Sequence, residues 1–323
     1  MKVREKIEAQ MNALGRQGRA FVFVIDFEGE NAEIFDPGET DRILWQANGK
    51  SNVDLNGRQR KPVQLDIEPI SFDQYKKGYD LVQSHIHKGD TYLLNYTQPT
   101  PLKTDLSLQD IYHQSSARYK VLLKDKFVCF SPEIFVQIND GKISSFPMKG
   151  TMDASIPNAE ELIMSDSKEL AEHSTIVDLI RNDLSLVATN VTVEKFRYLE
   201  KLQTNRRALW QVSSEITGNL PPDYAERIGE IIFKMLPAGS ICGAPKKKTV
   251  EIIKEAENYD RGYYTGIFGW FDGRNLDSCV LIRYIEKQDG KLVYKSGGGI
   301  TYMSDAQSEY DELVKKVYIP IFE

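Results

Sequence analysis

The chain has few residues of the kinds that bind soft metals, with three cysteines and four histidines among 323 residues. Cys129, Cys242 and Cys279 lie far apart and form no C-x-x-C pair, so we expect no thiolate zinc site and a reducing, cytoplasmic environment. The histidines form no H-E-x-x-H motif. If the protein uses a metal, the sequence therefore predicts a hard ion held by carboxylates.

The chain also lacks an excess of positive charge and a long apolar segment. Lysine and arginine number 41 and aspartate and glutamate 47, which gives a net charge of −6. No apolar run approaches the roughly 20 residues of a membrane span, and the first six residues do not have the pattern of a signal peptide. We therefore expect no nucleic-acid and no membrane partner, and an acidic ligand would need a local cation.

Helical and β-type patterns alternate along the chain, which predicts an α+β fold. Residues 21–27 and 91–97 have the apolar, β-rich composition of strands. Residues 71–88 predict an amphipathic helix that Gly89 ends. Because no internal repeat and no linker composition is evident, we expect residues 1–323 to form one large domain.

Two further β-type regions have features that bear on a site. Residues 127–137 predict one strand with Pro132 in its middle, which implies an edge or a bulge that re-aims Glu133. Residues 264–270, 278–285 and 292–296 predict three strands of a meander separated by turn residues.

A lysine between a proline and a glycine ends another predicted strand. Residues 142–146 are β-prone and run into Pro147, and Gly150 follows Lys149. Such a lysine presents its amine at a sheet edge or at the mouth of a pocket. Taken alone, this pattern is more often an exposed turn lysine, so its meaning depends on the rest of the chain.

Two predicted helices carry carboxylates on one face. Glu169 and Glu172 are spaced i, i+3 in the helix that begins near residue 165, and Glu309 and Glu312 have the same spacing in the last helix. The last helix follows the glycine run of residues 297–299. Paired carboxylates can form a divalent-cation or proton-transfer surface, but taken alone such a pattern is more often a solvated charged face.

Several motifs from Gly89 onward occur together and in a fixed order. They are Ser131-Pro132-Glu133, Pro147-Met148-Lys149-Gly150-Thr151, Lys168 to His173, Val177 to Leu184, Gly239 to Lys246 and Gly297 to Glu312. In these motifs the chain resembles the chorismate-utilising enzymes, which include anthranilate, isochorismate, salicylate and aminodeoxychorismate synthases. The resemblance implies an anthranilate-synthase-like fold of two packed antiparallel β-sheets flanked by helices, here with a shortened N-terminal portion of about 70 residues.

Within that family, a lysine in Pro-x-Lys-Gly-Thr marks component I of aminodeoxychorismate synthase. The resemblance then implies Mg²⁺-dependent amination of chorismate with ammonia to 4-amino-4-deoxychorismate, a step towards p-aminobenzoate and folate. Because no glutaminase domain is evident in the sequence, a separate glutamine amidotransferase subunit (component II) would supply the ammonia. Anthranilate synthase component I, or a non-catalytic subunit that binds chorismate or activates an amidotransferase, are the alternatives.

The resemblance also implies roles for individual residues. Lys149 would attack C2 of chorismate as a covalent nucleophile, which requires a neutral amine and hence a lowered pKa. Glu133 would protonate the departing 4-hydroxyl, which requires a raised pKa. Mg²⁺ would be held by Glu172 and Glu312, with Glu169 and Glu309 one helical turn before them. The residues that would bind the substrate's two carboxylates and ring are Thr151, Ser240, Tyr264, Arg283, Gly297, Gly298, Gly299 and Lys316.

Two positions depart from relatives that use water or eliminate pyruvate. Leu93 stands where isochorismate- and salicylate-type members have a water-activating lysine, and it cannot act as a base. Trp210 lies where family members usually carry a histidine. Both departures argue against the water-using and pyruvate-eliminating reactions, while the missing glutamine at position 93 leaves the handling of ammonia open.

Overall fold

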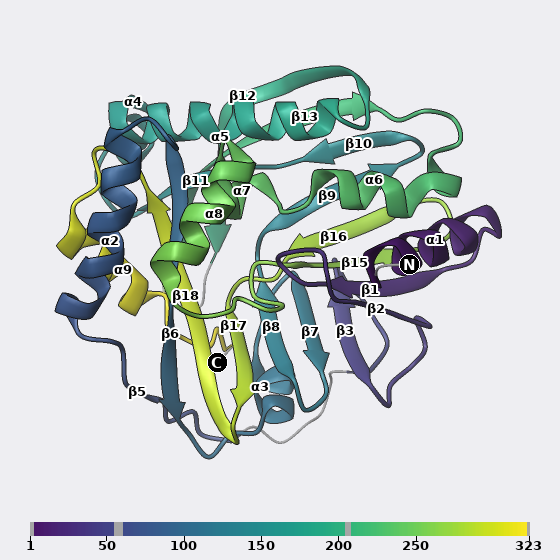
Figure 1. The fold of residues 1–323 in the computed structure, drawn as a ribbon, viewed down its shortest axis with the longest axis horizontal. Helices are drawn as coiled ribbons and strands as arrows, with labels where there is room; N and C mark the ends of the chain where they lie inside the picture. The colour runs from purple at the N-terminus through teal and green to yellow at the C-terminus, as the bar shows by residue number, and fades with distance from the viewer. Residues whose placement is uncertain (1–2, 55–60, 204–207, 322–323) are drawn as a thin grey trace.

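The computed structural model describes residues 3–54, 61–203 and 208–321. These residues form two sheets whose strand pairs are all antiparallel, with helices on their outer faces (Figure 1). This arrangement confirms the predicted α+β fold of two packed antiparallel sheets. None of the helices in these ranges has the length and apolar character that crossing a membrane requires.

The first sheet runs, in spatial order, through β11 (Met148–Asp153), β13 (Ala208–Asn219), β10 (Lys142–Ser145), β9 (Ile134–Asn139), β16 (Leu276–Val280), β15 (Ile267–Phe271), β1 (Phe21–Ile25) and β2 (Ala32–Phe35), with β12 (Thr189–Gln203) paired to β13. The second runs through β14 (Gly243–Ala244), β6 (Leu93–Lys103), β18 (Lys291–Ile300), β17 (Tyr284–Gln288), β8 (Phe127–Ser131), β7 (Tyr119–Leu123), β3 (Ile43–Ala47) and β4 (Lys50–Ser51), with β5 (Asp66–Ile67) paired to β6.

The helices are α1 (Val3–Arg16), α2 (Phe72–His87), α3 (Leu108–Gln114), α4 (Ala159–Ser165), α5 (Ser167–Ser185), α6 (Ile228–Met235), α7 (Gly239–Cys242), α8 (Lys246–Glu257) and α9 (Ala306–Lys315), with a 3₁₀ turn at Tyr224–Arg227. In Figure 1, α2 and α9 lie together at one side of the molecule, and α1 and α6 lie together at the other.

Apolar side chains fill the space between the sheets and the space under the helices. Val22 and Val24 of β1 pack with Trp45 of β3 and Val121 of β7, which joins the two sheets. Because successive side chains of a strand point to opposite faces, the alternate residues of β1, such as Phe23, pack in the cluster that includes the helices instead. The sequence of β1 is therefore apolar throughout, as a strand covered on both faces must be.

Two helix starts follow from the sequence as predicted. The Ser71 side chain accepts a hydrogen bond from the Gln74 N–H, and the Gln74 side chain accepts one from the Ser71 N–H, which makes a capping box before α2. The Asp166 side chain accepts from the Glu169 N–H at 3.0 Å and caps α5. This cap fixes where α5 begins, three residues before Glu169.

The two strands predicted over residues 127–137 and 278–285 are each two strands, and both of those predictions were wrong. Residues 127–131 pair in the second sheet and residues 134–139 in the first, so the chain changes sheets at Pro132. Residues 276–280 and 284–288 likewise belong to different sheets, so the predicted meander is not one sheet. Proline cannot donate to a ladder and ends it, but apolar patterning does not reveal which partner each half finds.

Two smaller differences concern loops. The predicted strand 292–296 continues through the glycines to Ile300, because residues 297–299 pair with Thr97, Tyr96 and Asn95 of β6. Residues 48–61 are polar and rich in glycine and asparagine, which predicts a loop. The structure places the short strand β4 among them, and residues 55–60 lie outside the described residues.

Candidate active site

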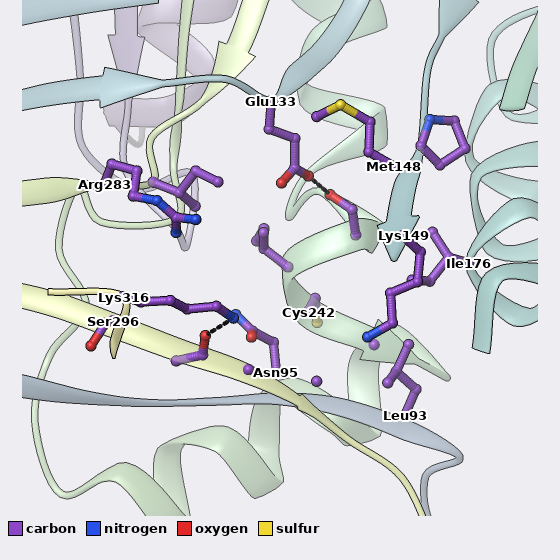
Figure 2. Close-up of a pocket in the computed structure, with 18 of the residues that line it drawn as sticks. Leu93, Asn95, Glu133, Met148, Lys149, Ile176, Cys242, Arg283, Ser296 and Lys316 are labelled. Carbon is purple, nitrogen blue, oxygen red and sulfur yellow. Dashed lines mark hydrogen bonds between the residues drawn. The ribbon is translucent and has the colours of Figure 1, made fainter. Parts of the chain in front are cut away.

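A cavity of about 160 Å³ lies where the chain crosses between the two sheets. Its walls come from β6, β11, α7, β18 and the two crossing segments. Figure 2 shows Glu133, Lys149, Arg283 and Lys316 projecting into this one space from different elements. Residues that are up to 183 positions apart in the sequence are therefore brought together.

The two crossing segments run side by side and hold each other. The Val280 N–H donates to the carbonyl of Glu133, and the Phe130 N–H donates to the carbonyl of Arg283, both at 3.1 Å. Arg283 has a φ of 53°, a left-handed conformation that only a tightly determined site imposes on a non-glycine residue. The paired crossings fix Glu133 and Arg283 at one end of the cavity.

Glu133 has the properties expected of a general acid. The hydroxyl of Ser240 donates to its Oε1 at 2.5 Å, so Ser240 orients this carboxyl directly. Burial raises the pKa of Glu133 above its usual range, although the Ser240 hydrogen bond and the positive charges of Arg283 and Lys316 act in the opposite direction. A carboxyl of this kind keeps its proton at a pH where an exposed glutamate has lost it.

Lys149 reaches the cavity from a bulge at the end of the first sheet. The register of β11 against β13 shifts between Met148 and Thr151, and Gly150 there has a φ of 84°. The Nζ of Lys149 lies 2.6 Å from Oε2 of Glu172 on α5. This confirms the predicted presentation of the amine at a sheet edge.

The pKa of Lys149 differs from the expectation. Burial lowers it, but the carboxylates of Glu172, Glu169 and Glu312 together raise it above its ordinary value. The sequence predicted a lowered pKa because it did not show that Glu172 would contact this amine. In the arrangement described here Lys149 is a cation paired with a carboxylate.

Cationic groups at the other walls are suited to bind an anion. Arg283 is partly buried, and its Nε is a buried nitrogen with no hydrogen-bond acceptor among the described residues. Lys316 donates to the Gly297 carbonyl at 2.8 Å and pairs with Glu312 at 2.6 Å, so it is positioned against the glycine strand. Tyr264 is buried beside them, and burial raises the pKa of its hydroxyl. The structure brings these groups together at one cavity, and their binding of the two carboxylates stays a prediction.

The four carboxylates predicted to hold a metal lie on α5 and α9, and none of them is among the residues that line the cavity. A Cβ added at Gly150 would lie 3.1 Å from Oε2 of Glu169, and one added at Gly298 would lie 3.2 Å from Oε2 of Glu309 and 3.8 Å from Oε1 of Glu312. Glycine at both positions leaves room for these side chains. Within the described residues, no three side chains of metal-binding type are already arranged around a point.

One predicted contact is wrong, and three residues were missed. Thr151 is exposed on β11 and does not line the cavity, because the bulge that turns Lys149 inward turns Thr151 away. Asn95 and Lys295 line the cavity, and only the pairing of β6 with β18 puts them there. Lys246 forms a partly buried ion pair with Asp183 at 2.6 Å, next to α7, which carries Ser240. From the sequence alone, its place directly after Pro245 predicts only the start of a helix.

The chain was compared with known proteins. Its residues 36–321 match the family described as chorismate binding enzyme. The protein is a member of this chorismate binding enzyme family. The chain is 49% identical over 315 residues to the "Uncharacterized PabA-like protein" of Pasteurella multocida, a match that covers 97% of each chain.

Other members of the chorismate binding enzyme family are more distant. Aminodeoxychorismate synthase component 1 of Bacillus subtilis is 29% identical over 281 residues, covering 82% of this chain and 58% of that relative. Anthranilate synthase component 1 of Acetivibrio thermocellus is also 29% identical, over 98% of this chain and 64% of that relative. The solved structure of anthranilate synthase component I from Streptococcus pneumoniae has a TM-score of 0.67 at 25% identity, over 80% of this chain and 60% of that one. This likeness confirms the predicted anthranilate-synthase-like fold.

Proposed function

We propose that this chain is component I of an aminodeoxychorismate synthase, which aminates chorismate with ammonia to 4-amino-4-deoxychorismate in the formation of p-aminobenzoate and folate. The observation that carries the proposal is the placement of the Lys149 amine and the Glu133 carboxyl in one cavity with several cations. A nucleophile, an acid and an anion-binding wall are what this substitution needs.

Chorismate carries a ring carboxylate and an enolpyruvyl carboxylate, and the cavity offers donors for both. The guanidinium of Arg283 suits a bidentate hydrogen bond to one carboxylate. Lys316 and the backbone of the glycine strand, residues 297–299, are placed for the other, and buried Tyr264 offers a hydroxyl between them. Burial of these donors strengthens their interaction with the charged substrate.

The chain's own residues account for the proton and bond changes. Lys149 first gives its extra proton to water, which leaves a neutral amine. Its Nζ then forms a bond to C2 while the C4–O bond breaks, and Glu133 gives its proton to the leaving hydroxyl, which departs as water. Ammonia then forms a bond to C4, and the C2–N bond to Lys149 breaks and restores the neutral amine, which takes up a proton from water again. An ammonium ion that loses its proton to Glu133 supplies the ammonia, so the sum is chorismate and ammonium giving the protonated amine and water.

The donor set fits Mg²⁺, which takes one or two protein carboxylates and completes its shell with water and substrate oxygens. Glu172 and Glu312 would hold the ion, with Glu169 and Glu309 as further ligands or as acceptors for its waters. A bound Mg²⁺ supplies positive charge that lets the ring carboxylate lie beside acidic side chains.

Two features favour ammonia over water as the entering group. Leu93 lines the cavity, and its side chain cannot deprotonate water. The relative from Bacillus subtilis that is named aminodeoxychorismate synthase component 1 is similar over most of this chain. We propose a glutamine amidotransferase subunit as the source of the ammonia. All three cysteines are free and buried, which supports a cytoplasmic location.

The test is to incubate the protein with chorismate, Mg²⁺ and an ammonium salt and to identify the product by mass. We expect 4-amino-4-deoxychorismate with no release of pyruvate. Anthranilate with pyruvate would instead support anthranilate synthase component I. Retention of unchanged chorismate by a folded, chorismate-binding protein would support the non-catalytic alternative.

A further inference from the structure

The segment that follows α9 lies at the cationic end of the active-site cavity. α9 ends at Lys315, and we call residues 316–321 the post-α9 segment. Its first residue, Lys316, lines the cavity, as does Arg283 from the crossing segment before β17. Figure 2 shows both cations entering the cavity from the side opposite Lys149. These are the two cationic side chains that we propose for the carboxylates of chorismate.

Contacts on either side of Tyr318 anchor the post-α9 segment outside the cavity. Val317 is buried in a cluster of apolar side chains from β8, β18 and α3. The N–H of Ser116, shortly after α3, donates to the carbonyl of Pro320 at 2.7 Å. Because residues 317 and 320 are both held, the backbone of Tyr318 between them has a defined place.

Tyr318 brings an aromatic ring against the guanidinium of Arg283. The guanidinium carbon of Arg283 lies over this ring, 5.6 Å from its centroid. The negative face of an aromatic ring attracts a cation, and a planar guanidinium is suited to stack on it. Tyr318 is 45% exposed, so its ring contacts the guanidinium without being part of the apolar core.

The Tyr318 ring restricts the side chain of Arg283 without neutralising it. Among the described residues no carboxylate forms an ion pair with Arg283, and its Nε has no hydrogen-bond acceptor there. An arginine side chain that is free to move loses conformational entropy when it binds a ligand, which weakens binding. A carboxylate partner would fix the side chain but would also compete with an anionic substrate. An aromatic ring fixes it and leaves its charge and its hydrogen-bond donors for that substrate.

We propose that Tyr318 is a positioning residue, whose ring holds the Arg283 guanidinium in the orientation that binds one carboxylate of chorismate. This inference rests on the proposed function, in which Arg283 binds that carboxylate. Tyr318 does not line the cavity, so its effect on the substrate passes through Arg283. The post-α9 segment thus serves both cations, because it carries Lys316 and orients Arg283.

Calorimetry with chorismate and Mg²⁺, without ammonium, measures the dissociation constant, and the amination assay gives KM and kcat. We expect Tyr318→Ala to raise the dissociation constant and the KM for chorismate at least about fivefold and to leave kcat within about twofold. Tyr318→Phe keeps the ring and should raise them less. Tyr198→Ala is the matched control and should change neither, because the Lys195 amine lies over the Tyr198 ring at the same 5.6 Å and neither residue lines the cavity.

A double variant distinguishes the positioning of Arg283 from a structural role. If Tyr318 acts through Arg283, Tyr318→Ala should change the dissociation constant by less than about twofold in an Arg283→Gln background. An equal loss of affinity in both backgrounds, or an unchanged dissociation constant in a folded Tyr318→Ala variant, overturns this inference alone. Tyr318→Leu, which also lacks the ring, takes the place of Tyr318→Ala if that variant does not fold. If Arg283→Gln itself leaves chorismate binding unchanged, the proposed role of Arg283 falls and the inference falls with it, whereas the identity of the product tests the amination separately.

Discussion

Lys149 and Glu172 form an ion pair of 2.6 Å between a bulge of β11 and the buried face of α5. One partner is the proposed nucleophile and the other a proposed metal ligand, so the two functions share a contact. A ligand that binds the carboxylate of Glu172 would compete with the Lys149 amine for that carboxylate. Substitutions at either residue should therefore be examined for both amine chemistry and metal dependence.

The first prediction concerns the covalent step. Lys149→Ala should abolish an adduct between protein and substrate, because alanine has no side-chain amine to form the bond to C2. The adduct is sought by intact-protein mass spectrometry after acid quenching of a reaction with chorismate. Lys142→Ala, an exposed lysine at the start of β10, is the matched control. Full amination activity in Lys149→Ala would show that Lys149 is not the nucleophile.

The second prediction concerns the acid. Because burial raises the pKa of Glu133 and the protonated form acts, kcat should fall as the pH rises through that pKa. Glu133→Gln should remove this limb of the pH profile and lower kcat by at least about 100-fold. Ser240→Ala removes a hydrogen bond that lowers the pKa of Glu133, so kcat should fall at a higher pH in this variant than in the unmodified protein. A limb that moves to lower pH in Ser240→Ala would contradict the assignment.

The third prediction concerns Mg²⁺. Glu312→Ala removes one of the two carboxylates proposed to hold the ion, so the Mg²⁺ concentration that gives half-maximal activity should rise by about tenfold or more. Asp311→Ala, an exposed carboxylate on the same helix, should leave it unchanged. Titration of activity with Mg²⁺ and direct binding by calorimetry check both variants. An identical Mg²⁺ response in Glu312→Ala would refute the ligand assignment.

The fourth prediction concerns the Lys246–Asp183 ion pair beside α7, the helix that carries Ser240. Lys246 pairs with Asp183 at 2.6 Å and also donates to the Met235 carbonyl, and Asp183 accepts from the Gly239 N–H. Lys246→Met leaves a buried carboxylate without its cation, which should destabilise the fold by about 3 kcal/mol. Urea denaturation measures this loss of unfolding free energy.

The double variant Asp183→Asn/Lys246→Met separates positioning from stability at the same site. It removes both charges and keeps an acceptor for the Gly239 N–H, so much of the stability should return. If Lys246 positions Ser240, the kcat of the double variant stays low, and the pH at which its kcat falls differs from that of the unmodified protein. Recovery of both stability and the unmodified pH profile would show that the ion pair is only structural.

The fifth prediction concerns a buried lysine far from the site. Burial lowers the pKa of Lys120 to about 8, and its Nζ donates to the carbonyls of Tyr112 and Ser115. Between pH 8 and the ordinary lysine pKa of about 10.4, the unfolded chain binds a proton that the folded chain does not. The unfolding free energy should therefore rise with pH in that window, by at most about 1.4 kcal/mol per pH unit.

Lys120→Met isolates this contribution from those of other titrating groups. Urea denaturation of both proteins at several pH values gives the difference in unfolding free energy, and that difference should shift in favour of the unmodified protein as the pH rises from about 8 to about 10. A pH-independent difference would show that Lys120 keeps its ordinary pKa in the folded state.

The sequence by itself determined which residue types the candidate site contains and where most of the elements lie. The amine of Lys149 between Pro147 and Gly150, and the carboxylates spaced i, i+3 on two helices, are local patterns, and local patterns survive folding. The capping residues Ser71 and Asp166 likewise act within one turn of their own positions. For these features the chain neighbours of a residue are also its structural neighbours.

The tertiary structure alone decided where the chain crosses between sheets and which charges meet. Residues 127–137 and 278–285 read as continuous strands, because a strand pattern records burial and not the identity of the pairing partner. Only the fold shows that Glu133 and Arg283 sit on neighbouring crossings. The same holds for the pKa of Lys149, which Glu172 raises across 23 residues of sequence. Electrostatic contacts of this kind depend on distances in space, which spacing along a chain does not fix.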